Sequence, residues 1–352
     1  MAVKIPEYIT GKYAVGTETF SLTDSSRTDE LGKNDGPRRI GVRMYYPADK
    51  QAVEGLERAD VFTPVLMEKL AQAYHVKPDK MPPEMLKGNF YSNAPHAEDG
   101  RFPLILFSHG YNSYIEANNC LCCELASNGY IVASVGHARE AVAIVYDDGT
   151  CDIYDKENNK RMINNYPATL WEQSRLLRAK LTPEKALEDF ERFRQKRGTF
   201  VSGRIRVWEK DMLCVLDELK SRYAQWIDFD RGVGVSGHSL GGATAYSMCL
   251  SCDEISCGVN IDGALFGEYG DKEMYKPFMH ICCKENRNCG TRAIVKAKAP
   301  YRFEEFDNMK HAGFTDAKFF IPYDFVVGKL DGEKMYRRLA DLHLDFFGEY
   351  LK

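Results

Sequence analysis

The sequence lacks a surplus of basic residues. Its 47 lysines and arginines face 51 aspartates and glutamates, and the formal net charge is -4. Nucleic-acid-binding domains usually carry a clear positive balance on one face. The composition therefore argues against nucleic acid as a partner and leaves a small molecule as the expected substrate.

Long apolar runs are also missing. The first thirty residues contain no apolar segment of the kind found in a secretory signal, and no run of about eighteen apolar residues occurs elsewhere. We therefore expect a cytoplasmic protein without stable membrane insertion. A homo-oligomer is compatible with the sequence, which does not specify the number of subunits.

Cysteine is present, but its spacing is poor for a metal site. The eleven cysteines include two clusters, Cys120, Cys122 and Cys123, and Cys282, Cys283 and Cys289. Only Cys120 and Cys123 have a C-x-x-C spacing, without a second such pair, and adjacent cysteines in an expected strand point to opposite faces. Without an export signal, free buried thiols are the expected state, and no metal is expected.

The order of apolar segments is typical of an α/β domain. Apolar runs bounded by turn residues alternate with helical patterns, which indicates a mostly parallel central sheet flanked by helices. The expected strands are residues 39–46, 103–108, 130–135, 232–236, 257–261 and 278–283. The expected helices are residues 115–128, 204–219, 240–251 and 333–351. The length fits a single domain over residues 1–352.

Two segments, 51–100 and 155–203, interrupt this alternation. The second is highly charged and contains helical patterns at 169–180 and 183–197. Thr182-Pro183-Glu184 has the residue types of a helix N-cap, first position and acidic first turn. We expect both segments to be cap or lid insertions, while a solvated helical face remains the simpler interpretation of the charge run.

One motif carries the functional prediction. Gly237-His-Ser-Leu-Gly241 is a G-x-S-x-G pattern between an apolar strand and a helix of small residues. Such a turn raises a serine hydroxyl above the sheet of an α/β-hydrolase, and its glycines let neighbouring segments approach. The motif predicts that fold with Ser239 as nucleophile. The N–H of Leu240, at the helix N-terminus, is one expected oxyanion donor.

The loop after residues 103–108 is expected to supply the second donor. The apolar run there ends in Ser108-His109-Gly110-Tyr111, and in this fold an N–H of that loop faces the oxyanion. Tyr111 is the expected residue. His109 precedes the nucleophile, whereas the chain order of the fold is serine, acid, histidine, so we interpret its side chain as a brace of the loop.

Three histidines follow the nucleophile. His280 falls in an expected strand and His343 on the C-terminal helix, whereas His311 lies in a Gly-containing loop. A base must reach the serine hydroxyl, and a loop at the sheet edge can place it there. His311 is therefore the expected base.

Asp262 is the expected acid, because it ends an apolar strand at the edge where such sheets bind ligands. Glu285, after the next strand, is the alternative. The positions expected to contact substrate are His109, His238, Phe266 and Phe314. Together these residues predict a two-step acyl transfer that requires neither a metal nor an organic cofactor.

With these motifs the chain resembles the platelet-activating-factor acetylhydrolase family, which is the lipoprotein-associated phospholipase group, and its bacterial relatives near the dienelactone hydrolases. The matching motifs span most of the chain: Gly41-Val-Arg-Met-Tyr-Tyr-Pro, Leu106-Phe-Ser-His-Gly, Gly136-His137, Asp211 to Leu219, Gly237-His-Ser-Leu-Gly-Gly, Asn260-Ile-Asp-Gly and His311-Ala-Gly-Phe-Thr-Asp. The resemblance implies the same three residues, Ser239, Asp262 and His311, and calcium-independent hydrolysis of short or oxidised acyl esters. Segments 51–100 and 155–203 match no pattern of the family.

Other functions stay open on the same scaffold. A lactonase, thioesterase, amidase or polyester hydrolase would use the same residues. A cysteine-dependent enzyme is less consistent with the sequence, because no cysteine occupies the nucleophile position. A non-catalytic binding protein of this fold would normally lack a member of the triad, and here candidates for all three are present.

Overall fold

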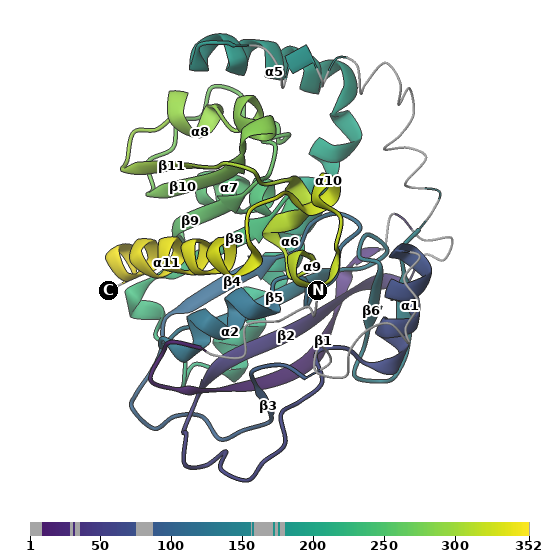
Figure 1. The fold of residues 1–352 in the computed structure, drawn as a ribbon, viewed down its shortest axis with the longest axis vertical. Coiled ribbons are helices and arrows are strands. Elements are labelled where there is room, and N and C mark those ends of the chain that lie inside the picture. The colour runs from purple at the N-terminus through teal and green to yellow at the C-terminus, as the bar shows by residue number, and fades with distance from the viewer. Residues whose placement is uncertain are drawn as a thin grey trace.

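The computed structural model describes residues 9–28, 31, 36–74, 87–155, 157, 172, 175–176 and 180–351. Within them, nine strands form one sheet in the order β11-β10-β9-β8-β4-β5-β2-β1-β3 (Figure 1). The strands from β11 to β5 run parallel, and β2 and β1 extend the sheet antiparallel. Their bounds are β1 Ala14–Thr28, β2 Pro37–Ala48, β3 Tyr91–Ser92, β4 Leu104–Ser108, β5 Ile131–His137, β8 Val233–His238, β9 Ile255–Ile261, β10 Phe278–Cys283 and β11 Tyr301–Phe306.

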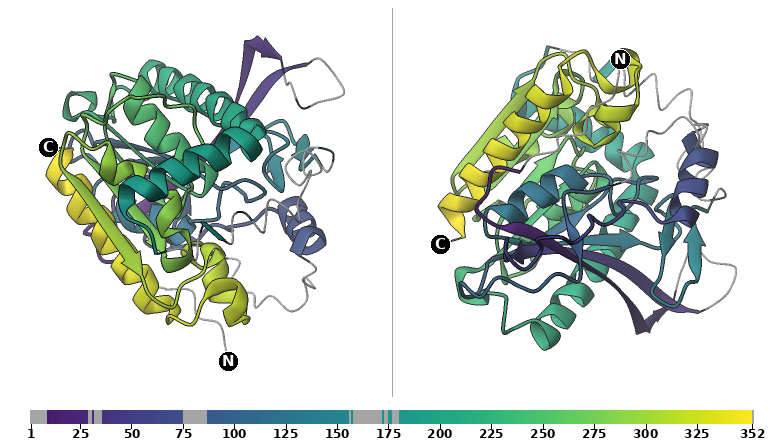
Figure 2. Two further views of the ribbon diagram at one scale, coloured as in Figure 1. Left: turned by 90° about the horizontal axis from the view of Figure 1, so that it is seen from above. Right: turned by 60° about the horizontal axis from the view of Figure 1, so that its bottom comes forward.

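The central strands are buried on both faces. Every residue of β4, β5, β8 and β10 is buried, which is the pattern of parallel strands covered by helices on each side. The antiparallel pair β1 and β2 ends in a hairpin that projects from the body of the molecule (Figure 2).

Two pairs of helices cover the sheet. On one face α6 (Thr199–Arg222) and α7 (Leu240–Ser251) bury Trp208, Met212 and Tyr246 in one core cluster. On the other face α2 (Asn119–Ser127) and α11 (Gly332–Tyr350) bury Leu121 and Phe346 in a second cluster. The nucleophile motif, between β8 and α7, therefore lies at the end of a strand held from both sides.

Shorter elements surround this core. They are α1 Pro64–Tyr74, the hairpin β6 Ala143–Val145 and β7 Cys151–Ile153, α5 Pro183–Arg197, η3 Phe229–Arg231, η4 Lys284–Cys289, α8 Arg292–Val295, η5 His311–Phe314, α9 Ala317–Phe320 and α10 Asp324–Val327. The side chain of Thr182 accepts a hydrogen bond from the backbone N–H of Lys185, as its N-cap prediction requires.

The predicted strands correspond to β2, β4, β5, β8, β9 and β10, and the predicted helices to α2, α6, α7 and α11. The helix predicted at 183–197 is α5, whereas the one predicted at 169–180 falls mostly outside the described residues. The sequence interpretation missed β1 and β11. Both are only partly buried along much of their length and carry charged residues, so neither shows the continuous apolar run of a central strand.

No helix of the described chain combines the length and apolarity that crossing a bilayer would require.

Candidate active site

Ser239 lies on a sharp turn between β8 and α7. Its backbone angles, φ 56° and ψ -120°, fall in a region that non-glycine residues seldom occupy. The flanking glycines are required by close approach: a Cβ on Gly241 would lie 2.1 Å from the carbonyl oxygen of Ser108, and one on Gly237 would lie 2.4 Å from the backbone of Gly241. The backbone N–H of Ser239 donates to the carbonyl of Ile261 at 2.9 Å, which ties the turn to β9.

His311 contacts both Ser239 and Asp262. Its Nε2 lies 2.9 Å from Ser239 Oγ, and its Nδ1 lies 2.6 Å from Asp262 Oδ2. Because the carboxylate can only accept, Nδ1–H is the donor there, which leaves Nε2 free to accept from the serine hydroxyl. The structure thus brings three of the expected residues into one hydrogen-bonded chain.

Asp262 is buried, and hydrogen bonds hold both of its carboxylate oxygens. It is 1% exposed, and its backbone also has a positive φ, 56°. Its Oδ1 accepts from the backbone N–H of Cys283 at 2.7 Å, and its Oδ2 accepts from the side chain of Asn286 at 2.7 Å. The alternative acid, Glu285, instead pairs with Lys310 on the surface.

The other two candidate bases face away from the serine. His280 accepts a hydrogen bond from Asn260 and His343 contacts Ser236, both inside the core. Burial lowers the pKa of each ring to about 4. Both histidines are therefore neutral packing residues at neutral pH.

In the part of the chain that the structure describes, no protein acceptor binds the two expected oxyanion donors. Within the described residues, the backbone N–H groups of Tyr111 and Leu240 donate to no other group. Gly110, between His109 and Tyr111, packs directly against the nucleophile, since a Cβ on it would lie 3.0 Å from Ser239 Cβ. The loop after β4 and the N-terminus of α7 thus meet at Ser239.

The expected substrate contacts divide into two groups. His238 lines the cavity beside Ser239, and its Nε2–H donates to the carbonyl of His311 at 3.0 Å. Burial, with a smaller effect of His311, lowers the pKa of His238 to about 3. His109 and Phe314 are fully buried and Phe266 packs against α5, and none of these three lines the cavity.

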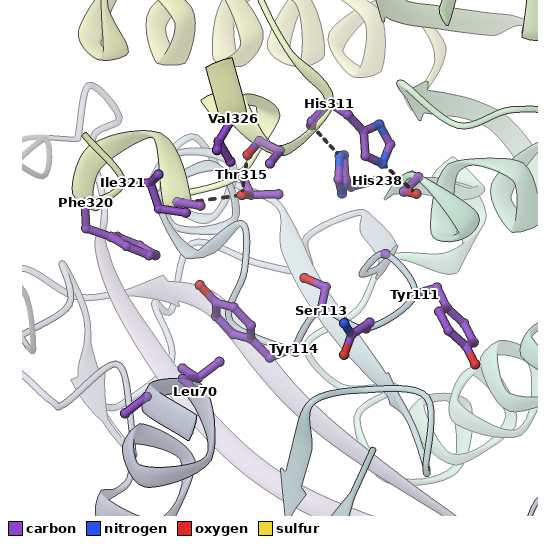
Figure 3. Close-up of a pocket in the computed structure, with 16 residues that line it drawn as sticks. Leu70, Tyr111, Ser113, Tyr114, His238, His311, Thr315, Phe320, Ile321 and Val326 are labelled. Atoms are coloured by element: carbon purple, nitrogen blue, oxygen red, sulfur yellow. Dashed lines mark hydrogen bonds between the residues drawn. The ribbon is translucent and has the colours of Figure 1, made fainter. Parts of the chain in front are cut away.

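A cavity of about 260 Å³ opens at Ser239 (Figure 3). Leu70 from α1 and Phe320 and Ile321 from the α9 region lie on the side away from His311, and Val326 of α10 also lines the cavity. No aspartate, glutamate, lysine or arginine is among the described residues that line it. The cavity therefore suits an uncharged, largely apolar group.

All eleven cysteines are unpaired, and eight of them are buried. Among the described residues, no group of three or more His, Cys, Asp or Glu side chains is arranged to hold a metal ion.

Two features of the site were missed by the sequence interpretation. Asn286 reaches Asp262 from η4, a contact that no local pattern signals. A second chain of polar residues, Ser108, His137 and Asp211, is buried behind the loop after β4. The sequence did contain a sign of this second chain. Ser108 and His137 each end an apolar strand, and a buried polar side chain there requires a hydrogen-bond partner.

A strand–turn–helix with its serine at the turn, an acid after the next strand and a histidine after β11 is the arrangement of an α/β-hydrolase. The sheet order and the flanking helices agree with it. More narrowly, the chain belongs to the family described as platelet-activating factor acetylhydrolase, isoform II, whose model matches residues 1–333.

Among curated proteins, the platelet-activating factor acetylhydrolase of Cavia porcellus is 24% identical over 69% of this chain and 53% of that protein. A probable 1-alkyl-2-acetylglycerophosphocholine esterase of Arthroderma benhamiae is 23% identical over 73% of this chain and 58% of that protein. The chain thus spans little more than half the length of these relatives.

A solved ferulic acid esterase from Streptomyces cinnamoneus shares the fold with a TM-score of 0.76. It is 21% identical and the match covers 98% of this chain and 92% of that one. Together, these comparisons confirm the predicted family and the predicted fold class.

Proposed function

We propose that the protein is a serine carboxylester hydrolase that cleaves short-chain acyl esters through an acyl-enzyme on Ser239. The observation that carries this proposal is the chain from Ser239 Oγ through His311 to Asp262, with contacts of 2.9 and 2.6 Å at the mouth of a cavity. Nucleophile, base and orienting acid in hydrogen-bond reach of one another are the parts that acyl transfer needs.

In the first step, Ser239 Oγ attacks the ester carbonyl while His311 Nε2 takes the hydroxyl proton. The carbonyl oxygen becomes an oxyanion, which the N–H groups of Tyr111 and Leu240 stabilise. Asp262 stabilises the imidazolium that forms. The C–O bond to the alcohol then breaks, and His311 gives its proton to the departing alkoxide.

In the second step, water takes the place of the alcohol. His311 removes a proton from the water, whose oxygen attacks the acyl carbon through the same oxyanion geometry. The bond to Ser239 Oγ breaks, and the proton returns to that oxygen. The acid product leaves and the enzyme regains its starting state.

The cavity supports small, uncharged substrates. Its volume is at the low end for small-molecule sites, and its described lining offers no charged partner for a phosphate or a carboxylate. Burying such a charge without a partner is costly. A short neutral acyl ester satisfies both conditions.

The direct test is intact-mass analysis after incubation with a fluorophosphonate, alongside hydrolysis of p-nitrophenyl acetate and longer esters. We expect one adduct and ester turnover in the wild type, with both lost in Ser239→Ala. Folded wild-type protein that forms no adduct and turns over no ester would favour a binding protein of this fold. Turnover that resists the phosphonate would favour a cysteine nucleophile.

A second assay tests the substrate class. We expect a 1-alkyl-2-acetylglycerol to be cleaved with a higher kcat/KM than the same compound carrying phosphocholine. The opposite preference would show that a charged group outside the described lining recognises the headgroup. Lactone, thioester, amide and polyester substrates in the same assay would separate the alternative hydrolases.

The lid assignments also remain part of the proposal. Leu70 and Ala71 of α1, within segment 51–100, line the cavity, as a lid would. In segment 155–203, α5 packs through Phe190 and Phe193 against Phe266. The cytoplasmic location stays a prediction, which cell fractionation would check.

A further inference from the structure

Behind the loop after β4 lies a second chain of serine, histidine and aspartate. Ser108 Oγ is 2.9 Å from His137 Nε2, and His137 Nδ1 is 2.9 Å from Asp211 Oδ2. All three side chains are completely buried, and none of them lines the cavity at Ser239. This chain therefore cannot meet a substrate, and its role must be sought in what it holds.

Charged groups fix this chain in place. Arg38 donates to both oxygens of Asp211, at 2.6 and 3.2 Å, and Trp208 stacks on the His137 ring at 3.8 Å. Burial alone would raise the pKa of Asp211, but Arg38 and the hydrogen bond from His137 outweigh it and hold that pKa below its usual value. His137 therefore keeps one orientation against a permanent carboxylate.

His109 connects this chain to the loop. Its Nε2 accepts from the backbone N–H of His137 at 3.3 Å, and its Nδ1 lies 2.6 Å from the carbonyl oxygen of Gly110. A backbone N–H can only donate and a carbonyl can only accept, so both contacts require the neutral tautomer with its proton on Nδ1. Burial, aided by His137, lowers the pKa of His109 to about 3, which keeps it in that form.

The held carbonyl belongs to the peptide unit that carries the expected oxyanion donor. The C=O of Gly110 and the N–H of Tyr111 share one rigid plane and, in a trans peptide, point in opposite directions. The Gly110 oxygen accepts from His109 and, at 3.1 Å, from the backbone N–H of Ser113. Because the two hydrogen bonds fix the direction of the Gly110 C=O bond, they also fix the Tyr111 N–H bond, which points in the opposite direction.

We propose that His109 is a positioning residue for the oxyanion site: it orients the Gly110–Tyr111 peptide, and the backbone N–H of His137 holds His109. The inference rests on the proposed function, since it assigns a use to the Tyr111 N–H. His109 touches neither substrate nor Ser239 in this scheme. Its effect is on a donor that matters only when negative charge develops on the substrate oxygen.

A matched pair of amides tests the proposal. In His109→Asn the side-chain nitrogen can take the place of Nδ1 and donate to Gly110. In His109→Gln the amide extends toward the position of Nε2 and lacks that donor. We expect kcat on p-nitrophenyl acetate to fall on the order of 100-fold in His109→Gln, the loss typical of one oxyanion donor, with KM little changed.

His109→Asn should recover most of that loss, and both variants should keep the pH profile of the wild type, because His311 is untouched. Equal activities of the two amides, or a loss carried by KM, would overturn the proposal. Thermal melting of both variants controls for folding, and the two are compared only with each other if both are destabilised. Wild-type turnover and labelling test the proposed function separately, so either claim can fail alone.

Discussion

Within the described residues, two chains of serine, histidine and aspartate have nearly the same internal geometry. The contacts are 2.9 and 2.6 Å from Ser239 through His311, and 2.9 and 2.9 Å from Ser108 through His137. Their surroundings differ in every other respect. The His311 side chain is 46% exposed at the cavity, whereas that of His137 is 0% exposed.

The backbone and the charges differ as well. Ser239 has a positive φ at a helix N-terminus, while Ser108 ends a regular strand. Asp211 is neutralised by buried Arg38, whereas neutral donors hold Asp262. The comparison teaches that the hydrogen-bond pattern alone does not define a catalytic triad; access, an exposed hydroxyl and nearby oxyanion donors complete it.

The largest expected effect separates the two serines. Ser239→Ala should lower kcat on the order of 10⁶-fold, as loss of a triad nucleophile does. Ser108→Ala removes one neutral hydrogen bond of about 1 kcal/mol, so it should cost less than about tenfold in kcat. Steady-state kinetics on p-nitrophenyl acetate measures both. A similar loss in the two variants would mean that the buried chain takes part in the chemistry.

Replacing the two aspartates should affect different properties: activity for Asp262 and stability for Asp211. In Asp262→Asn an amide nitrogen can face His311 Nδ1–H, which favours the wrong tautomer, and kcat should fall roughly 10⁴-fold. Single-turnover acylation, followed by release of p-nitrophenol, would locate the loss in the first step. An acylation rate within tenfold of the wild type would remove Asp262 from the mechanism.

Asp211→Asn should instead destabilise the fold. It removes the nearer of the two carboxylates that face buried Arg38, leaving Glu140 at 3.6 Å, and it also breaks the pair of Asp211 with Arg27. Breaking a buried pair in this way costs about 3–5 kcal/mol. Urea unfolding gives the free energy directly. Asp217→Asn, an exposed position on the same helix, is the matched control and should change stability by less than about 0.5 kcal/mol. Equal effects would show that Glu140 alone is a sufficient partner for Arg38.

The buried histidines predict a pH-dependent stability. Burial lowers the pKa of His343 to about 4, whereas an unfolded histidine titrates near 6.5. The unfolded state therefore takes up the proton first as pH falls, and stability is lost between about pH 6.5 and pH 4. His343→Gln should reduce the slope of unfolding free energy against pH by up to about 1.4 kcal/mol per unit. An unchanged slope would mean that His343 is protonated in the native state.

The smallest expected effect concerns the cavity at Ser239 and His311, which the buried residues Ser108, His137 and Asp211 do not line. Leu70→Arg places a cation in its lining, and should raise the kcat/KM for mono-p-nitrophenyl succinate relative to p-nitrophenyl pentanoate roughly tenfold, or about 1.4 kcal/mol. Val65→Arg, exposed on the same helix and outside the lining, is the control. No change in the ratio would place the acyl group elsewhere.

The sequence predicted the parts of this molecule that depend on local patterns. The apolar strand and glycines around Ser239 specify the turn, and the helical stripe of residues 333–351 specifies α11. Asp262 and His311 followed from the chain order of the fold. The outer strands β1 and β11 could not be predicted in this way, because partly exposed strands that carry charged residues lack a continuous apolar run.

Contacts between residues far apart in the chain could not be predicted from local sequence patterns. Asn286 on η4 contacts Asp262, which lies 24 residues earlier in the chain. His109 accepts a hydrogen bond from the backbone of His137, which lies 28 residues later.

Phe266 and Phe314 were expected to contact the substrate. In the structure Phe314 is fully buried, and the partly buried Phe266 packs against Phe190 and Phe193.

The eight buried thiols can serve as probes of local opening of the fold. A reagent reaches Cys122 on α2, Cys257 on β9 or Cys289 on η4 only while the surrounding layer is open. Burial also raises the pKa of Cys289 to about 12, so its closed form hardly reacts. The order in which mass spectrometry finds these cysteines alkylated would therefore record which side of the sheet opens first, in the unmodified wild-type chain.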